Sequence, residues 1–151
     1  MASVEKKCLP LGYSLHDGYP STPEYLHLRS AAGLSPKTPS QAAAVPTGSW
    51  YGCYITFKED DSTPKAVAMG RIIGDGGWYF HIADMAVDPG HQRKGLGDAI
   101  LKALLAKIKQ DAPADGKPYI SLLADGPGRP LYAKNGFVES APASLGMVLK
   151  N

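Results

Sequence analysis

The residues best suited to chemistry lie in the stretch MAVDPGHQRKGLGDAI, which runs from Met85 to Ile100. In this stretch an apolar run precedes a glycine-containing turn, and a helix-like segment follows the turn. Glycines at positions 95 and 97 let the backbone approach a ligand, and successive N–H groups at a helix N-terminus form a donor array with positive partial charge. Arg93 and Lys94 add full charges beside those donors. The turn is therefore predicted to bind an anion, and a pyrophosphate suits it better than a carboxylate.

Other readings of the same turn are less consistent with its residues. A dinucleotide fingerprint would need a third glycine where Ile100 stands, and a P-loop would need Gly-Lys-Ser/Thr closing a longer loop. The remaining alternative is a plain glycine turn whose cations are solvated. We keep both the anion-binding turn and the plain turn as hypotheses.

The turn has to be positioned by the elements on either side of it. Upstream, the periodicity predicts a helix with Thr22 as N-cap and Gly33 beyond its end, and a short helix after Thr38. Antiparallel strands are then predicted at 50–57, 65–73 and 78–87, with the glycine turn GDGG before the last of them. Strand alternation places Trp78, Phe80, Ile82 and Asp84 on one face, and Tyr79, His81, Ala83, Met85 and Val87 on the other, unless a bulge shifts the phase.

Downstream of the turn, the pattern predicts a β-α-β unit. Helix 98–110 carries its apolar residues on one face, namely Ile100, Leu101, Leu104, Leu105 and Ile108. The run PYISLLA is typical of a strand buried on both faces and parallel to the strand before the helix. Residues 130–135 are predicted to form a short helix that stops at Gly136, followed by closing strands FVES and LGMVLK.

Composition limits the class of protein. A chain of 151 residues, 44% hydrophobic and 20% charged, is the size of one globular domain, here 1–151. A formal charge of +2 is too small for a nucleic-acid-binding surface. Two cysteines and four scattered histidines provide neither a disulfide framework nor a metal site. Without an apolar leader or the ~18 apolar residues of a membrane span, we expect a cytoplasmic protein with no membrane partner.

Two segments resemble motifs of the GNAT superfamily of N-acetyltransferases. The run from Gln92 through Arg93, Lys94, Gly95 and Leu96 to Gly97 matches the Gln/Arg-x-x-Gly-x-Gly/Ala pyrophosphate loop of that superfamily. The segment LYAKNGFVE is similar to its Tyr-x-x-x-Gly-Phe signature. The resemblance is clear from about Ala66 to Phe137, whereas residues 1–65 share only the expected order of strand, two helices and strand.

The resemblance implies a single-domain α/β (α+β) fold. Its sheet would be mixed, mostly antiparallel and twisted, with six to seven strands flanked by about four helices and a β-α-β unit for acetyl-CoA. Residues 1–65 would form the acceptor-binding part, 66–137 the acetyl-CoA-binding core and 138–151 the closing strands. Sheet edges and closing strands are also compatible with a homodimer.

The implied co-substrate is acetyl-CoA. Its pyrophosphate would lie on the loop, and its pantetheine arm would pair with the main chain of the preceding strand, where one N–H would polarise the thioester carbonyl. The cofactor-binding residues implied by the resemblance are Met85, Ala86, Val87, Gln92, Arg93, Lys94, Gly95, Leu96, Gly97 and Asp125. Asp125 departs from the asparagine found in many members, and an ionised acid is a poorer donor.

Acetyl transfer to an amine needs a proton acceptor for the amine and a proton donor for the departing thiolate. Tyr132 occupies the donor position of the family, although it can equally be a packing residue. Asp84 and His81 are the candidate bases, with an ordered water as a third choice. The alternatives are that Asp84 pairs with Arg71 or caps a backbone group, and that His81 is a structural hydrogen-bonding residue.

The acceptor is expected to be the primary amine of a small molecule, such as an arylalkylamine or a polyamine. The aromatic and cationic candidates to line its site are Tyr25, Arg29, Trp50, Tyr51 and Trp78. Tyr25 and Arg29, four residues apart, would share one helix face. The alternatives are a protein or peptide N-acetyltransferase, a non-catalytic acyl-CoA sensor, and a generic phosphate or nucleic-acid binder, which the weak net charge disfavours.

Overall fold

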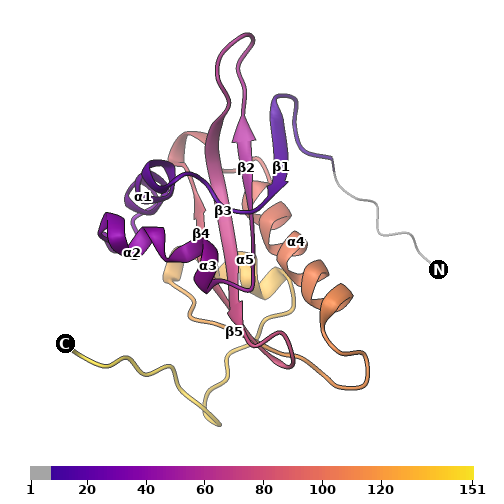
Figure 1. Cartoon of the computed structure of the whole chain (residues 1–151). Helices are drawn as coiled ribbons and strands as arrows, with labels where there is room; N and C mark the ends of the chain where they lie inside the picture. The colour runs from indigo at the N-terminus through magenta and orange to yellow at the C-terminus, as the bar shows by residue number, and fades with distance from the viewer. Residues whose placement is uncertain (1–7) are drawn as a thin grey trace. The chain divides into compact units, whose positions relative to one another are not determined.

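A five-stranded sheet is the framework of the chain, for which the computed structural model describes residues 8–151 (Figure 1). The described residues form two compact units, 8–121 and 122–151. The strands, in spatial order, are β1 (Tyr13–Asp17), β2 (Tyr51–Phe57), β3 (Lys65–Gly74), β4 (Tyr79–Val87) and β5 (Tyr119–Leu122). The first four pair antiparallel, as the three predicted strands require.

The β-α-β unit is confirmed. Helix α4 (Leu96–Asp111) connects β4 to its neighbour β5, which is the connection that parallel strands need, and the sheet is therefore mixed. The expectation that β5 is buried on both faces is wrong. Tyr119 is 48% exposed and the other three residues of β5 are half-buried, because β5 is the edge strand of the sheet.

The segment between β1 and β2 forms three helices: α1 (Thr22–Ala31), α2 (Pro39–Ala43) and α3 (Val45–Gly48). Ser21, not Thr22, is the N-cap of α1, because its hydroxyl accepts from the Glu24 N–H and donates to the Glu24 carboxylate. Thr38 caps α2 through a capping box with Gln41, as the predicted helix start requires.

Helices cover both faces of the sheet (Figure 1). Tyr25 and Leu28 of α1 pack with Met69 and Ala86 of the sheet. On the other face, α4 buries five residues along one side, namely Leu96, Ile100, Leu101, Leu104 and Ile108. Burial of these apolar side chains is the main force that holds the helices against the two faces of the sheet. No helix within residues 8–151 has the length and apolar character of a membrane span.

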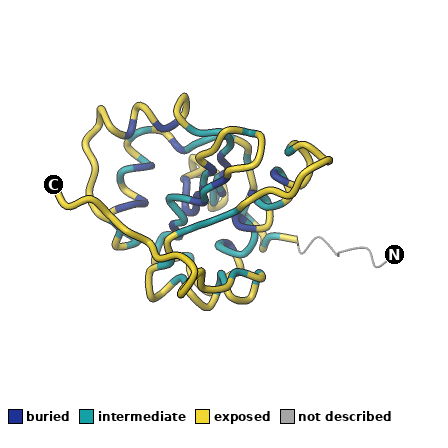
Figure 2. Tube along the Cα trace, turned by 90° about the horizontal axis from the view of Figure 1, so that it is seen from below, coloured by how far each residue is buried: buried dark blue, intermediate teal, exposed yellow. Residues whose placement is uncertain are grey.

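The second unit contains the short turn η2 (Gly126–Gly128) and helix α5 (Arg129–Lys134). Helix α5 stops at Gly136, whose φ of +92° is the left-handed conformation expected there. The closing strands predicted after it are absent from the described residues, so the sheet has five strands rather than six or seven, and five α-helices accompany it. Residues 138–151 are all exposed (Figure 2). Their apolar residues are compatible with a strand, but a strand forms only by pairing, and this segment pairs with none.

Candidate active site

The predicted anion-binding turn adopts a left-handed backbone twice, at Arg93 (φ +62°) and at Gly95 (φ +80°). Gly95 is the N-cap of α4, and no side chain caps that helix. Among the described residues, no acceptor lies in hydrogen-bond geometry with the main-chain N–H groups of residues 93–97. Alternating backbone hands with unpaired N–H groups at a helix N-terminus are the usual protein site for phosphate oxygens.

The base of this turn is tied to the sheet on both sides. The Gln92 side-chain amide donates to the Val87 carbonyl at the end of β4, at 3.2 Å. The Tyr13 hydroxyl lies 2.6 Å from His91 Nδ1, and the ring of Phe57 packs against both residues. The turn therefore has a fixed position relative to β1, β2 and β4.

Strand β4 contains a bulge opposite Gly70, a position that lies against Ile100 and Leu104 of α4. Arg71 is opposite Ala83 and Met69 is opposite Ala86, so that Gly70 alone faces two residues, Asp84 and Met85. Asp84 is left-handed, with φ +57°. A Cβ on Gly70 would lie 2.7 Å from the Met85 sulfur and 2.6 Å from Ile100. Glycine at position 70 thus leaves the space into which the bulge directs the Met85 side chain.

The bulge overturns the predicted face of Asp84. Residues opposite each other in a sheet share a face, so His81 shares a face with Ile73, and Ala83 shares one with Arg71. Asp84 contacts Arg71 directly and therefore lies on this same face, not with Phe80 and Ile82. The extra residue of a bulge shifts the alternation by one, which is why both candidate bases emerge on one side of β4.

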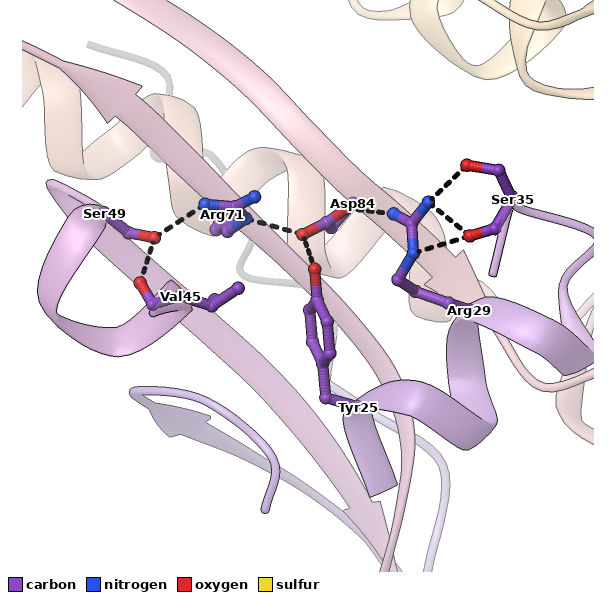
Figure 3. A network of polar contacts seen from close by, with 7 residues as sticks. All are labelled: Tyr25, Arg29, Ser35, Val45, Ser49, Arg71 and Asp84. Atoms are coloured by element: carbon purple, nitrogen blue, oxygen red, sulfur yellow. Dashed lines mark hydrogen bonds and ion pairs between the residues drawn. The ribbon is translucent and has the colours of Figure 1, made fainter. Parts of the chain in front are cut away.

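Asp84 lies at the centre of a buried polar cluster (Figure 3). Its carboxylate accepts from the Tyr25 hydroxyl at 2.5 Å, from Arg71 Nε at 2.5 Å and from Arg29 Nη1. Only 7% of the Asp84 side chain is exposed. Tyr25 and Arg29 do share one face of α1, as predicted, and both are buried. The pairing of Asp84 with Arg71, one of the two alternatives for this carboxylate, is confirmed.

Both guanidinium groups are held by serines that the sequence analysis missed. Arg29 donates from Nε and Nη2 to the Ser35 carbonyl, and from Nη2 also to the Ser35 hydroxyl. Arg71 donates from Nη1 to the Ser49 hydroxyl at 3.0 Å, and Ser49 in turn donates to the Val45 carbonyl. Arg71 is the single charge inside the apolar run AVAMGRII, and this is the signal that marks it in the sequence.

His81 is the other candidate base on this face of β4. Its Nδ1 lies 3.1 Å from the Ser121 hydroxyl on β5. Burial lowers the pKa of the His81 imidazole below its ordinary value, because a partly desolvated ring is harder to charge. His81 is therefore neutral at pH 7 and can accept a proton.

The two tryptophans predicted for the acceptor site are not joined to this cluster. Trp50 packs its ring against Phe80 at 4.9 Å, and Phe80 faces away from Arg71 and His81 by strand alternation. Trp78 is 58% exposed and contacts Tyr79. Tyr51 donates to Asp17 instead. Aromatic character alone did not indicate which face of the sheet these rings would occupy.

Tyr132 belongs to the second unit, on α5. A Cβ on Gly128 would lie 2.8 Å from the Tyr132 ring, so glycine there makes room for it. Burial raises the pKa of the Tyr132 phenol, and the negative charge of Asp125 raises it further. The phenol is therefore protonated at neutral pH and is a candidate general acid. Phe137 packs edge-on against the same ring.

Cys53 is the buried one of the two free cysteines among residues 8–151, and Cys8 is exposed. The Cys53 thiol is buried, and burial together with the Asp17 charge raises its pKa to about 12, so that it stays protonated and unreactive. In the same residues, no three histidine, cysteine, aspartate or glutamate side chains are grouped as metal ligands.

The sequence of this chain matches a known protein family. The profile of the acetyltransferase (GNAT) domain matches residues 50–139, which is more than half of the chain. The chain therefore belongs to the GNAT family of acetyltransferases. This family membership confirms the resemblance found in the sequence.

Individual relatives agree with this assignment. A solved structure from meticillin-resistant Staphylococcus aureus, described as a protein of unknown function and probable acetyltransferase, is 33% identical with a TM-score of 0.81. That match covers 92% of this chain and 99% of the other. A GNAT family protein from Streptococcus pneumoniae is 21% identical with a TM-score of 0.72, over 92% and 98% of the two chains, and shows the fold alone.

Two further relatives have a more specific description. The chloroplastic GCN5-related N-acetyltransferase 1 of Arabidopsis thaliana is 33% identical over 94 residues. That match covers 62% of this chain and 46% of the relative, so this chain spans about half the length of that relative. The ribosomal-protein-S18-alanine N-acetyltransferase of Escherichia coli is similar in fold, with 19% identity and a TM-score of 0.66 over 85% and 79% of the chains.

Proposed function

We propose that this protein transfers the acetyl group of acetyl-CoA directly to the primary amine of a small molecule. The observation that carries the proposal is the turn at 93–97, whose main-chain N–H groups have no acceptor among the described residues. Such an array at a helix N-terminus is suited to the oxygens of a diphosphate. Arg93 and Lys94 are exposed beside it and contribute two positive charges.

The proposed path of the coenzyme follows the sequence order of its binding residues. The diphosphate is bound by Gln92 to Gly97, and the pantetheine arm pairs with main-chain groups of Met85 to Val87. The bulge favours this, because the extra residue of a bulge is left out of the ladder and keeps an unpaired main-chain group. An N–H there can donate to the thioester carbonyl, a contribution worth ~2.7–4 kcal/mol in other acyl-transfer enzymes.

The reaction is a direct displacement. The lone pair of the amine attacks the thioester carbon, the carbon–sulfur bond breaks, and coenzyme A leaves as a thiolate. The amine loses one proton to a base, and the thiolate gains one from an acid. His81 is the proposed base because its imidazole is neutral at pH 7. Tyr132 is the proposed acid because its phenol stays protonated.

Asp84 is better suited to positioning than to proton transfer. Its two oxygens already accept three charge-assisted or phenolic hydrogen bonds, and only 7% of its side chain is exposed, which limits access for an incoming amine. The proposal for Asp84 is that it holds Arg71 and the first helix in place. The assignment of Asp84 as the base stays a prediction, and the pH experiment below separates it from His81.

The test is a thiol-release assay over a broad panel of amines, with acetyl-CoA as donor. We expect release that depends on the amine, and an acetylated amine of the expected mass in the products. The panel includes peptides with an N-terminal alanine, because the E. coli relative is described as acting on the alanine of ribosomal protein S18. Acetylation of these peptides alone would replace the small-molecule proposal. Coenzyme binding without turnover of any amine would identify an acyl-CoA sensor instead.

A further inference from the structure

The polar cluster around Asp84 has an excess of positive charge. Arg29 and Arg71 contribute two charges and Asp84 removes one, which leaves a net charge of +1. The small cavity beside the cluster has no second acid in its lining, which consists of Tyr19, Pro20, Tyr25, Met69, Gly70, Arg71 and Asp84. A partly desolvated positive charge attracts an anion and repels a cation.

The two arginines differ in how many of their guanidinium nitrogens donate hydrogen bonds. Arg29 donates from all three of its nitrogens to Asp84 and Ser35. Arg71 donates from Nε and Nη1, whereas its Nη2 has no acceptor among the described residues. Figure 3 shows one guanidinium nitrogen of Arg71 without a contact. An 18% exposed side chain with an unused N–H edge is suited to a carboxylate.

Arg71 and the proposed base lie on the same face of neighbouring strands. Arg71 is directly opposite Ala83, so His81 is its diagonal neighbour, and such neighbours are about 7–8 Å apart, with the Cβ atoms somewhat closer. The cavity beside Arg71 has a volume of about 10 Å³, room for one water at most. A ligand larger than water therefore does not fit in this cavity, and the inference places it on the face that Arg71 shares with His81. A molecule held there by a carboxylate would bring an amine one or two carbons away to the imidazole.

The surface beyond His81 is apolar and open. Tyr79 is 43% and Tyr119 48% exposed, and their rings are 5.5 Å apart. Both lie on the face of His81, because Tyr79 precedes His81 by two residues and Tyr119 precedes its partner Ser121 by two. Ile73, opposite His81, is 39% exposed. This platform suits an apolar or aromatic side chain on the acceptor.

We infer that the acceptor is an amino acid or a close analogue, with its carboxylate on Arg71, its amine at His81 and its side chain on the Tyr79–Tyr119 platform. The inference rests on the proposed acetyl transfer and narrows its substrate class. It disfavours polyamines, which the net positive charge repels, and arylalkylamines, which lack the carboxylate.

The experiment compares acceptors that differ only in the α-carboxylate: phenylalanine with phenethylamine, leucine with 3-methylbutylamine, and histidine with histamine. Spermidine is added as a polyamine. For at least one pair, kcat/KM of the amino acid is expected to exceed that of its decarboxylated partner by about tenfold or more, as for a charge-assisted contact. Preference for the decarboxylated amines or spermidine overturns the inference and leaves acetyl transfer standing.

Variants of Arg71 identify the source of the preference. Arg71→Gln removes the charge and should abolish the preference for the amino acid, whereas Arg71→Lys keeps the charge and should retain part of it. Lys65→Gln, an exposed cation on the same strand, removes the same charge at a distance and should leave the preference unchanged. Retained coenzyme affinity shows that each variant is folded. An unchanged preference in Arg71→Gln contradicts the inference.

A binding measurement separates failure of the inference from failure of the proposed function. Phenylalanine, leucine and histidine are titrated calorimetrically into the protein with coenzyme A present. If no amine is acetylated, acetyl transfer fails, yet amino-acid binding that Arg71→Gln abolishes still supports the carboxylate site. Absence of such binding, together with absence of amino-acid turnover, overturns the inference.

Discussion

Asp84 has a left-handed backbone conformation, with φ +57°, and only 7% of its side chain is exposed. Both features follow from one cause. The bulge directs this residue to the face of α1, and there Tyr25, Arg29 and Arg71 converge on its carboxylate. Two guanidinium groups this close together are tolerated only with an anion between them.

Asp84→Asn should therefore destabilise the fold. Asparagine tolerates the left-handed conformation, so the substitution removes charge without adding backbone strain. We expect a loss of about 3 kcal/mol in the free energy of unfolding, measured in urea, because two partly buried cations lose their counter-ion. Asp60→Asn is the matched control, since Asp60 is also left-handed (φ +45°) but exposed, and its effect should stay within about 0.5 kcal/mol. Equal effects of both variants would contradict the role of the cluster.

His81 should determine the acid side of the pH–rate profile. Its pKa lies below the ordinary value of about 6.5, so the neutral base predominates at pH 7 and is lost as the pH falls through that lowered pKa. With both substrates saturating, log kcat should rise with pH to a plateau, and the midpoint of the acid limb should lie below pH ~6.5.

His81→Gln should abolish this acid limb and lower kcat by about a hundredfold or more. His16→Gln, which removes a histidine paired with Thr56 on β1 and β2, should keep the limb. An intact acid limb in His81→Gln would transfer the base role to Asp84 or to an ordered water.

At the scale of elements, the turn before α4 and the bulge in β4 are two departures from regular structure that lie next to each other in the chain. Each leaves main-chain groups that a continuous strand or a capped helix would have paired. The structure fixes them from outside, through Gln92 and His91 at the turn and through Gly70 opposite the bulge. Irregular backbone of this kind is common at ligand-binding sites.

Gly95 allows a well-matched test of the turn. Gly95 (φ +80°) and Gly33 (φ +81°) have the same left-handed conformation, and a Cβ at either position would meet no atom within 4 Å. Gly95→Val and Gly33→Val should each lose at least about 1 kcal/mol of stability through backbone strain. Only Gly95→Val should lose coenzyme A binding, with Kd raised about a hundredfold, because only Gly95 borders the donor array. Calorimetric titration measures this, and equal Kd values for the two variants would exclude the turn as the diphosphate site.

At the scale of the whole molecule, the candidate residues are divided between the two compact units. The first unit contains the donor turn, the bulge, the Asp84 cluster and His81, whereas the second contains Asp125 and Tyr132. Residues 138–151 add a stretch of exposed apolar side chains, among them Val138, Met147 and Leu149. The protein thus combines a framework built by the sheet with a shorter C-terminal unit that has its own packing around Tyr132.

Tyr132→Phe should separate binding from chemistry. Because the phenol stays protonated at neutral pH, its removal takes away the acid that neutralises the leaving thiolate. We expect kcat to fall about a hundredfold while the Kd of acetyl-CoA stays within about twofold. Tyr54→Phe on β2, whose ring stacks on His16, removes a hydroxyl with no hydrogen-bond partner among the described residues and should change neither value. An unchanged kcat in Tyr132→Phe would show that the thiolate leaves without this acid.

Local sequence was sufficient for everything that depends on neighbouring residues. The donor turn, the capping box at Thr38, the left-handed stops at Gly33 and Gly136 and the amphipathic face of α4 all follow from residue types a few positions apart. The β-α-β unit around α4 could also be predicted from the sequence, since nearly all such crossover connections between parallel strands have the same, right-handed, geometry. The resemblance to the family likewise rests on two local motifs, the loop from Gln92 to Gly97 and the segment LYAKNGFVE.

Tertiary structure alone decided which distant residues meet. The bulge at Asp84 depends on the absence of a side chain at Gly70, which lies on another strand, and alternation along β4 cannot reveal it. The same bulge places Asp84 on the face of His81, where its carboxylate is the counter-ion of Arg29 and Arg71. The strands predicted after residue 137 are likewise absent. A strand forms only where a partner edge is available, and sequence periodicity does not show whether one is. The candidate binding and catalytic residues could thus be predicted from local motifs, whereas the ion pairs of Asp84 depend on contacts between residues that are distant in the sequence.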